Sequence, residues 1–349
     1  MKKYIIRTGE GEAFNAASKA RRDADAIALR LSYAPFEFHG ARTAGGSILG
    51  AVRLALDGLR NWRRLIREAE PGSFVLIQYP HYPMKSALLA RWMLPRAQRK
   101  GLRFIALIHD LDSLRGLHGS AAAYSDRKLL PLFDAVICHN GRMAEYLRQQ
   151  GIPGGKLVEL GIFDYLTGSE GEEHRQTDGI AVAGNLSPEK CGYVRELVDM
   201  GLSLHLYGKG LEAVNLPENV HLHGAFPPEA LPGELAGGFG LVWDGPSASA
   251  CAGKSGEYLR WNNPHKFSLY MAAALPVALW GKAALADFAR DNGVGIAIEK
   301  LDDLSNTIQG ISDEQYERMR RNAARIGSEV REGAYLTRAL TRAEALLRS

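Results

Sequence analysis

The sequence predicts an α/β protein made of two doubly wound parallel-sheet domains, and three observations support this prediction. Short apolar runs rich in β-branched and aromatic residues alternate with longer segments of helical periodicity. These runs are continuously apolar, which is typical of strands buried on both faces of a parallel sheet. The pattern stops at the polar, charged stretch 167–179 and then restarts, and a length of 349 residues suits two domains.

In the first half, strands and helices alternate with little interruption. Helices are predicted where apolar residues recur at spacings of three and four, and glycine follows two of them. The predicted strands are 3–8, 73–80, 103–110, 134–139 and 156–165, and the predicted helices are 15–31, 47–69, 86–100 and 141–150.

The second half repeats the same order and ends in two helices. Its predicted strands are 179–186, 202–210, 219–226, 239–245, 276–280 and 293–301, and its predicted helices are 263–275, 283–293, 312–333 and 334–349. We therefore expect a first domain over 1–166, a linker over 167–179, a second domain over 180–312 and terminal helices over 313–349.

Composition excludes several classes of protein. The net charge of +4, from 43 basic and 39 acidic residues, is too small to indicate a nucleic-acid partner. It is compatible with an anionic small-molecule substrate or with weak association with an anionic membrane surface. For the arginine-rich stretch 59–67, a solvated helix face and contact with a membrane or partner both remain open.

The cysteines and the apolar segments favour a cytoplasmic protein, with the inner face of the membrane left open. Cys138, Cys191 and Cys251 are odd in number and have no metal-site spacing, so we expect reduced thiols. No segment reaches about 18 uninterrupted apolar residues. The N-terminus, MKKYIIRTGEGEAF, resembles neither a signal peptide nor a membrane span.

Polar residues and glycines follow the strands of the second half. In doubly wound folds ligands bind at the carboxyl ends of the strands. Here those ends carry Asn185, Gly208 and Asp244, and glycine lets a backbone approach a ligand closely. We therefore expect the main ligand at this edge of the second sheet.

The segment 263–266, Asn-Pro-His-Lys, opens an apolar helix at the same edge. Proline suits a first helical turn, and the free N–H groups and dipole of that turn attract anions. Lys266 and His265 add donors for phosphate oxygens. The sequence therefore predicts a diphosphate site, although an ordinary helix start with a solvated lysine stays open. Replacing Lys266 by alanine is expected to weaken ligand binding and leave the fold intact.

In the first half, the polar strand ends suggest a proton acceptor. His109 and Asp110 follow a buried strand, and a carboxylate there is placed to take a proton from an attacking hydroxyl. A turn-forming aspartate with a structural histidine is the alternative. Asp110 and Asp112 also match the DxD pattern, in which two aspartates bind a metal ion. Neither GxGxxG nor a P-loop occurs at the strand ends, so no dinucleotide cofactor is expected.

Several motifs in order resemble the glucosyltransferase 3-like bacterial sugar transferases. They are GNLSPEK (184–190), GFGLVWDG (238–245), EYLRWNNPHKFSLYMAAALPVALW (257–280) and AALADFARDNGVGIAI (283–298), with IHDLDSLR (108–115) and GIFDYL (161–166) in the first half. The resemblance implies a GT-B architecture, in which two Rossmann-like domains face a cleft and a C-terminal helix returns to the first domain. It also implies a UDP-sugar donor and self-association into a homo-oligomer.

The resemblance also implies which residues hold the donor. It places Lys266 on the diphosphate, within a donor segment made of Asn263, Pro264, His265, Lys266, Phe267 and Ser268. It adds Asn185 and Lys190 at the same cleft, and Asn15 and Ala16 from the first domain. The segment GEGEAFNAASKA departs from the expected pattern, since no glycine-serine turn follows Asn15.

Together these features predict a cytosolic glycosyltransferase in which an acceptor hydroxyl attacks the anomeric carbon of a UDP-sugar. Asp110 or His109 is the expected base, and neither a cofactor nor a metal is expected. The acceptor is a glycan, glycolipid or glycoprotein of cell-surface polysaccharide or adhesin glycosylation, with glucose and galactofuranose both open as the sugar. The alternatives are a non-catalytic nucleotide-sugar-binding partner subunit, a phosphorylase, or an epimerase, for which the NAD fingerprint is missing.

Overall fold

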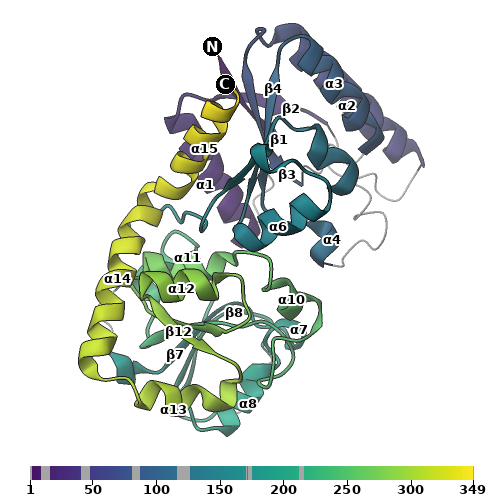
Figure 1. Ribbon diagram of the computed structural model, residues 1–349. Coiled ribbons are helices and arrows are strands. Elements are labelled where there is room, and N and C mark those ends of the chain that lie inside the picture. Colours follow the sequence, from purple (N-terminus) through teal and green to yellow (C-terminus); the bar gives the residue numbers. More distant parts are fainter. Residues whose placement is uncertain are drawn as a thin grey trace. The chain divides into compact units, whose positions relative to one another are not determined.

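The computed structural model describes residues 2–8, 16–40, 48–80, 87–115, 126–169, 171, 175–211 and 216–348. The chain forms two compact units, shown in Figure 1. Unit 1 comprises residues 1–13, 24–160 and 336–349, and unit 2 comprises residues 14–23 and 161–335. The main segment of unit 2 thus begins at Gly161, ahead of the predicted linker.

Unit 1 is built on a six-stranded, all-parallel sheet in the order β2-β1-β3-β4-β5-β6. Its strands are β1 (Lys3–Thr8), β2 (Ala34–Phe38), β3 (Phe74–Tyr79), β4 (Arg103–Ile108), β5 (Ala135–Cys138) and β6 (Leu157–Glu159). Every residue of β3 and β5 is buried, as the continuous apolar runs predicted.

The helices of unit 1 cover this sheet. They are α1 (Ala16–Arg30, of which 24–30 belong to the unit), α2 (Ile48–Glu68), α3 (Ala87–Arg99), α4 (Asp112–Arg115) and α6 (Gly141–Gln149). The C-terminal helix α15 (Ala334–Leu346) also packs here, since Glu344 Oε1 accepts hydrogen bonds from Lys3 Nζ (2.7 Å) and Tyr33 Oη (3.0 Å).

Two strands of unit 1 differ from the prediction. The edge strand β2 was not predicted, because its sequence APFEF is short and carries Pro35, which is tolerated only at an edge. Strand β6 has three residues where ten were expected. The chain turns away at Gly161, whose φ of +91° is a conformation that favours glycine.

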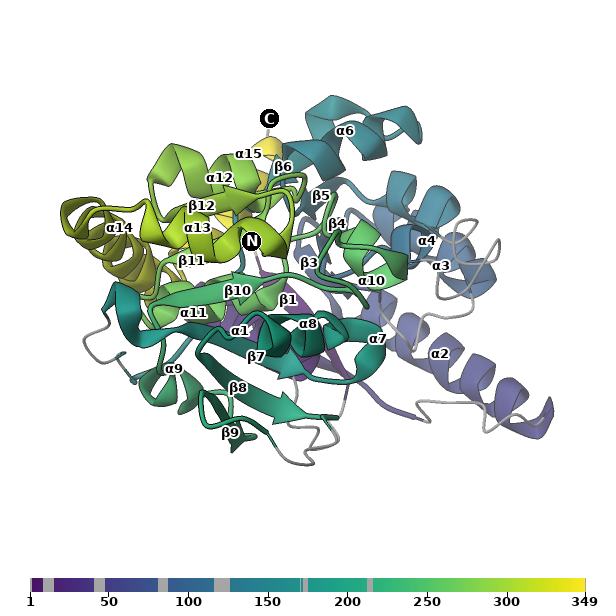
Figure 2. The same cartoon turned by 90° about the horizontal axis from the view of Figure 1, so that it is seen from below.

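Unit 2 repeats the architecture with the strand order β12-β11-β10-β7-β8-β9, again all parallel, as Figure 2 shows. The strands are β7 (Ile180–Asn185), β8 (Leu204–Lys209), β9 (Val220–Gly224), β10 (Phe239–Val242), β11 (Val277–Trp280) and β12 (Gly295–Ile298). The α/β prediction with two parallel sheets is therefore confirmed.

The helices of unit 2 are α7 (Pro188–Cys191), α8 (Tyr193–Asp199), α9 (Leu231–Glu234), α10 (Gly253–Tyr258), α11 (His265–Ala272), α12 (Leu285–Asn292), α13 (Leu304–Gln309) and α14 (Asp313–Glu332). Periodicity alone did not reveal the short helices α7, α8, α9, α10 and α13. Within the described residues, no helix combines the length and the apolar character needed to cross a bilayer.

Helix α11 is the central buried helix of unit 2. Tyr270 lies over Gly240 of β10, where an added Cβ would stand 2.3 Å from the tyrosine ring. On its other side α11 packs on α14, where a Cβ at Gly327 would stand 2.3 Å from the carbonyl oxygen of Met271. These close contacts fix the position of α11 and, with it, the polar residues at its start.

Candidate functional site

Four predicted site residues meet at the carboxyl edge of the unit 2 sheet. Asn185 ends β7, Asp244 follows the end of β10, Lys190 lies in α7, and Lys266 is the second residue of α11. The structure thus brings together residues that are up to 81 positions apart in the sequence, as the rule on strand ends predicts.

Lys266 and Asp244 form a buried ion pair with Lys190 beside it. Lys266 Nζ lies 2.7 Å from Asp244 Oδ1 and also donates to the carbonyl oxygen of Trp243 at 3.1 Å. Lys190 Nζ lies 4.0 Å from Asp244 Oδ2. The side chains of Lys266 and Asp244 are only 15% and 10% exposed, whereas that of Lys190 is 43% exposed.

The charge on Lys266 is secured by this pairing. Burial by itself lowers the pKa of a lysine, but the Asp244 carboxylate more than offsets it, so the pKa of Lys266 lies above its ordinary value. The picture of a solvated lysine at a helix start is therefore wrong. The expectation that its removal leaves the fold intact is revised, because Asp244 would lose its main partner.

Short contacts hold α7 against the end of β10. The backbone N–H of Gly245 donates to the carbonyl oxygen of Lys190 at 2.8 Å. The thiol of the neighbouring Cys191 donates to the carbonyl oxygen of Asn185 at 3.1 Å, and burial raises the pKa of this thiol. Cys191 is therefore a neutral packing residue that fixes Lys190 near Asp244.

The start of α11 is tied to the segment 161–165 within unit 2. Asn263 Nδ2 donates to the carbonyl oxygen of Gly161 at 2.9 Å, and Ser268 Oγ donates to that of Phe163 at 2.6 Å. Phe267 is fully buried and packs edge-on against the ring of Phe288. These predicted site residues therefore position the helix start.

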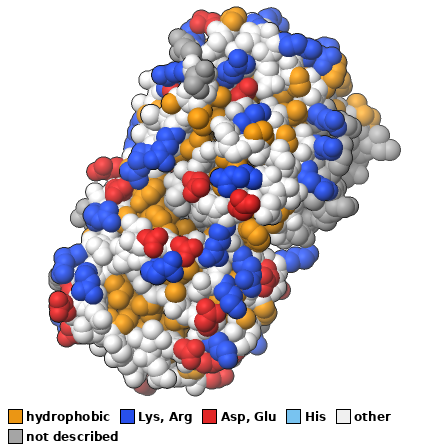
Figure 3. All heavy atoms as spheres, viewed as in Figure 1, with side chains coloured by type: hydrophobic (Ala, Val, Ile, Leu, Met, Phe, Trp, Pro, Cys, Tyr) orange, Lys and Arg blue, Asp and Glu red, His pale blue; other side chains and the backbone are white. Residues whose placement is uncertain are grey.

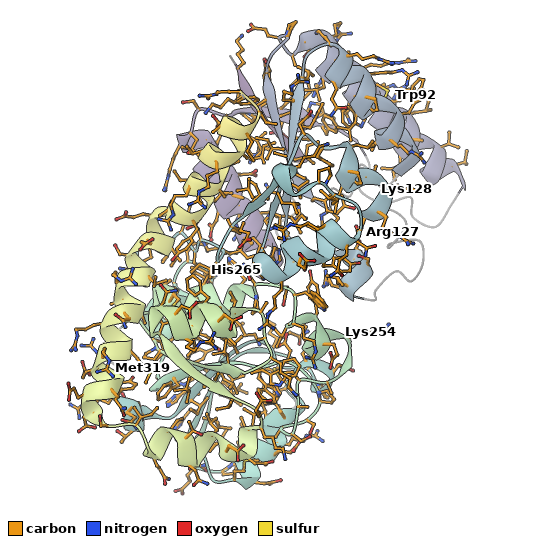
Figure 4. All side chains as sticks on the ribbon, in the orientation of Figure 1. Trp92, Arg127, Lys128, Lys254, His265 and Met319 are labelled. Atoms are coloured by element: carbon orange, nitrogen blue, oxygen red, sulfur yellow. The ribbon has the colours of Figure 1, made fainter. Side chains whose placement is uncertain are left out.

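His265 is neutral rather than a cationic phosphate donor. Its ring stacks on Tyr165 at 4.9 Å, and its Nε2 lies 3.3 Å from the carbonyl oxygen of Asp164. Burial, followed by the charge of Lys19, lowers its pKa to about 4. Lys266 and Lys190 therefore supply the positive charge, and Figure 4 shows His265 at the start of α11.

Pro264 occupies the position that precedes the helix rather than its first turn. Its ψ of 134° is extended, while its carbonyl oxygen accepts a hydrogen bond from Phe267 N–H at 3.0 Å, and this combination is typical of the residue that precedes a helix. No side chain caps this helix. Its first N–H groups and the helix dipole are therefore available to an anion near Lys266.

Gly208 and Asn185 have local structural roles at this edge. Gly208 has a φ of +148°, and a Cβ there would stand 1.8 Å from the carbonyl oxygen of Gly184. Only glycine fits, because strands β7 and β8 approach so closely. The Asn185 side chain is exposed and accepts the N–H of Ser187 at 2.9 Å, which shapes the turn into α7.

Two predicted donor residues fall at the limit of what the structure describes. Asn15 lies outside the described residues. Ala16 is the first residue of α1, and only its backbone is described.

The carboxyl edge of the unit 1 sheet carries a hydrogen-bonded chain that ends at His109. His109 Nε2 lies 2.7 Å from Gln78 Oε1, and Gln78 Nε2 donates to Asp25 Oδ1 at 2.7 Å. Arg7 Nε donates to the other oxygen of Asp25 at 3.2 Å. Because an amide oxygen only accepts, Nε2 of His109 carries the proton. No sequence signal pointed to Asp25, which is far from its partners in the chain.

Asp110 and Asp112 have separate surroundings. Asp110 Oδ2 accepts a hydrogen bond from Arg115 Nη1 at 2.9 Å and is partly exposed, while Asp112 opens α4 as its first acidic residue. In the part of the chain that the structure describes, no group of three or more His, Cys, Asp or Glu side chains is placed to hold a metal ion.

The remaining histidine and cysteines at the strand ends are structural. His139 Nε2 donates a hydrogen bond to the carbonyl oxygen of Ile108 at 3.1 Å, and burial lowers the pKa of His139 to about 4. Burial raises the pKa of Cys138 to about 12 and that of Cys251 well above its ordinary value. None of these groups is charged near neutral pH, so none contributes charge to either strand edge.

Both halves of the chain resemble known protein domains. Residues 2–162 match the glucosyltransferase 3-like N-terminal domain, and residues 180–343 match the C-terminal domain of the same family. The chain is 39% identical over 238 residues to the β-1,6-galactofuranosyltransferase WbbI of Escherichia coli (strain K12), an alignment that covers 67% of this chain and 68% of WbbI. It is 29% identical over 212 residues to glucosyltransferase 3 of Streptococcus gordonii, covering 59% and 60% of the two chains.

Solved structures share the same two-sheet architecture. The Anabaena protein HepE in complex with UDP-glucose superposes with a TM-score of 0.62 at 13% identity, and the match covers 100% of both chains. At this identity the likeness establishes the fold, which is GT-B. The chain belongs to the glucosyltransferase 3-like family of glycosyltransferases.

Proposed function

We propose that the chain is a hexosyltransferase that moves glucose or galactofuranose from a UDP-sugar to a hydroxyl group of a glycan, glycolipid or glycoprotein. The observation that carries the proposal is the pair of ammonium groups of Lys190 and Lys266, which approach the two oxygens of Asp244 at the carboxyl edge of unit 2. The names of two relatives, a galactofuranosyltransferase and a glucosyltransferase, support hexosyl transfer, and the UDP-glucose bound to HepE supports the donor.

In this proposal the diphosphate of the donor lies against Lys190, Lys266 and the start of α11. Two of the three ammonium hydrogens of Lys266 point at Asp244 and at the carbonyl oxygen of Trp243, and the third is directed to a phosphate oxygen. Lys190 is accessible to the ligand because its side chain is 43% exposed. Asp244 holds Lys266 in place, and the helix dipole adds to the net positive charge.

The chemical step follows from this placement. The acceptor oxygen bonds to the anomeric carbon of the sugar, while the bond from that carbon to the β-phosphate oxygen breaks and UDP leaves with the electron pair. Preorganised donors that face the developing charge supply a large part of such catalysis. In the proposal, His109 or Asp110 takes the proton of the acceptor hydroxyl.

A binding and turnover experiment tests this function. The protein is titrated calorimetrically with UDP, GDP, CMP and NAD, and then incubated with UDP-glucose or UDP-galactofuranose and a glycan acceptor. We expect UDP to bind best, and a ligand at a hundredfold excess over its Kd to stabilise the fold by about 2.7 kcal/mol. NAD binding more tightly than UDP would refute the proposal. Tight UDP-sugar binding without release of UDP on any acceptor would indicate a non-catalytic subunit instead.

A further inference from the structure

The outward face of α2 combines exposed apolar side chains with arginines in one continuous stripe. Leu49, Val52 and Leu56 are 83%, 51% and 48% exposed, which is unusual for large apolar residues. The stripe, which we call the α2 stripe, consists of Leu49, Val52, Arg53, Leu56, Arg60, Arg63 and Arg67, all of them exposed.

The spacing places these residues on one side of the helix. Apart from the adjacent pair Val52 and Arg53, successive members are three or four positions apart, so the stripe runs along one side of the helix over about 27 Å. The opposite face is anchored in unit 1: Trp62 is 1% exposed and packs against the rings of Phe38 and Phe104, and Asn61 exchanges hydrogen bonds with the backbone of His39. The stripe is therefore directed away from the core by the packing of the helix.

Helix α3 extends the same character beside α2. Trp92 lies on α3, where Figure 4 labels it, and its side chain is 49% exposed. The guanidinium of Arg96 lies 3.4 Å from the centre of its ring. Helices α2 and α3 pack against each other. In Figure 3, basic side chains line the edge of the molecule where these two helices lie.

The charge of the two helices is concentrated well beyond that of the chain. Together α2 and α3 carry eight arginines and two acidic residues, a net charge of +6, whereas the whole chain carries +4. Asp57 lies 3.1 Å from Arg60 and 4.0 Å from Arg53, and Glu68 lies 2.8 Å from Arg67. These two carboxylates offset only a quarter of the arginines.

We propose that the α2 stripe and the adjoining Trp92 dock unit 1 on an anionic lipid bilayer. Guanidinium groups pair with lipid phosphates, and the three aliphatic side chains enter the boundary between headgroups and acyl chains. Tryptophan favours the same boundary, because its ring is apolar and its N–H is polar. A nucleic-acid partner would use the arginines but gives no reason for three exposed aliphatic residues in the same stripe. This proposal does not depend on the identity of the donor or the acceptor.

The test is sedimentation of the full chain with vesicles of phosphatidylcholine, with and without phosphatidylglycerol, at low and high salt. We expect binding to the anionic vesicles that falls as salt rises. The charge variant R60Q/R63Q/R67Q removes about 1 kcal/mol per arginine, which corresponds to an affinity loss on the order of 100-fold. The apolar variant L49Q/V52Q/L56Q is expected to bind at least tenfold more weakly.

Matched controls exist elsewhere in the chain. R318Q/R321Q/R325Q removes three exposed arginines with the same spacing from helix α14, and M200Q/L222Q/L346Q replaces three other exposed apolar residues. Both controls should bind vesicles like the parent, and all variants should melt like it, since every altered side chain is exposed.

Several results would overturn the proposal. One is an absence of vesicle binding by the parent at low salt, and another is an equal loss in the α14 control, which would mean that only net charge matters. If the apolar variant bound vesicles as tightly as the parent, the stripe would be a simple polyanion site. If the parent self-associated and only the stripe variants abolished this, a second copy of the chain would be the occupant.

Discussion

Replacing Lys266 by methionine separates the two roles of this lysine. The variant keeps the aliphatic stem and removes the ammonium group, which lies 2.7 Å from Asp244 Oδ1 in a place where the two side chains are 15% and 10% exposed. The Asp244 carboxylate is then buried with Lys190 as its nearest ion-pair partner, at 4.0 Å. Leaving one partner of a buried pair uncompensated costs about 3–5 kcal/mol.

The loss of stability depends on the positive charge that remains near Asp244 after the substitution. Because Lys190 still compensates part of the charge, we expect the lower end, about 3 kcal/mol. Unit 2 has 185 residues (14–23 and 161–335), and for that size 3 kcal/mol lowers Tm by about 6–12 °C. The assay is thermal unfolding followed by circular dichroism, with UDP affinity measured by calorimetry well below Tm.

The double variant K266M/D244N supplies the control. Removing the Asp244 charge as well should restore more than half of the lost stability, because no uncompensated carboxylate is left, but it should not restore UDP binding. A K266M protein that melts like the parent would refute the ion-pair argument. A double variant that binds UDP like the parent would refute the assignment of Lys266 to the diphosphate.

Three further predictions concern the same framework. Gly208→Ala should lower the unfolding free energy in urea by more than about 3 kcal/mol, because its Cβ would stand 1.8 Å from the carbonyl oxygen of Gly184. The control Gly201→Ala has a φ of +72° and no atom within 4 Å of its Cβ, so it should lower the unfolding free energy by about 1 kcal/mol. Equal losses in the two variants would contradict the packing argument. The pKa of His265 is about 4 in the folded state and 6.5 ordinarily, so its stabilising contribution is full above pH 6.5 and is lost as pH falls toward 4. The unfolding free energy of the parent should therefore fall across this window, and His265→Gln should reduce the slope of that fall by up to about 1.4 kcal/mol per pH unit. An unchanged slope would contradict the assignment of a neutral His265. Transfer should survive EDTA, because the α11 start and the lysines stabilise the leaving diphosphate; loss in EDTA with recovery in manganese would reassign Asp110 and Asp112 as ligands.

The sheets were predictable because burial on both faces demands continuous apolar runs. β3, β4 and β5 are such runs, and the strand rule located Asn185, Asp244 and Lys266 at one edge. The edge strand β2 was missed because its sequence APFEF is short and carries Pro35, which argues against a strand except at an edge.

The partners within the site were not predictable in the same way. The pairing of Lys266 with Asp244, and the stacking of His265 on Tyr165 that keeps the imidazole neutral, depend on which loops the sheet brings together. The chain from Asp25 through Gln78 to His109 likewise joins α1, β3 and the end of β4, which periodicity in the sequence does not place side by side.

UDP calorimetry on Lys190→Gln tests most directly whether the carboxyl edge of unit 2 binds the donor diphosphate. Lys2→Gln is the control, since Lys2 is also an exposed lysine paired with one carboxylate, Glu70 at 2.7 Å, but precedes β1 at the amino edge of the unit 1 sheet. A lost charge-assisted contact is worth about 1.5–3 kcal/mol, so Lys190→Gln should weaken UDP binding roughly 10- to 150-fold while Lys2→Gln leaves it unchanged. UDP affinity equal to that of the parent in Lys190→Gln would contradict the claim.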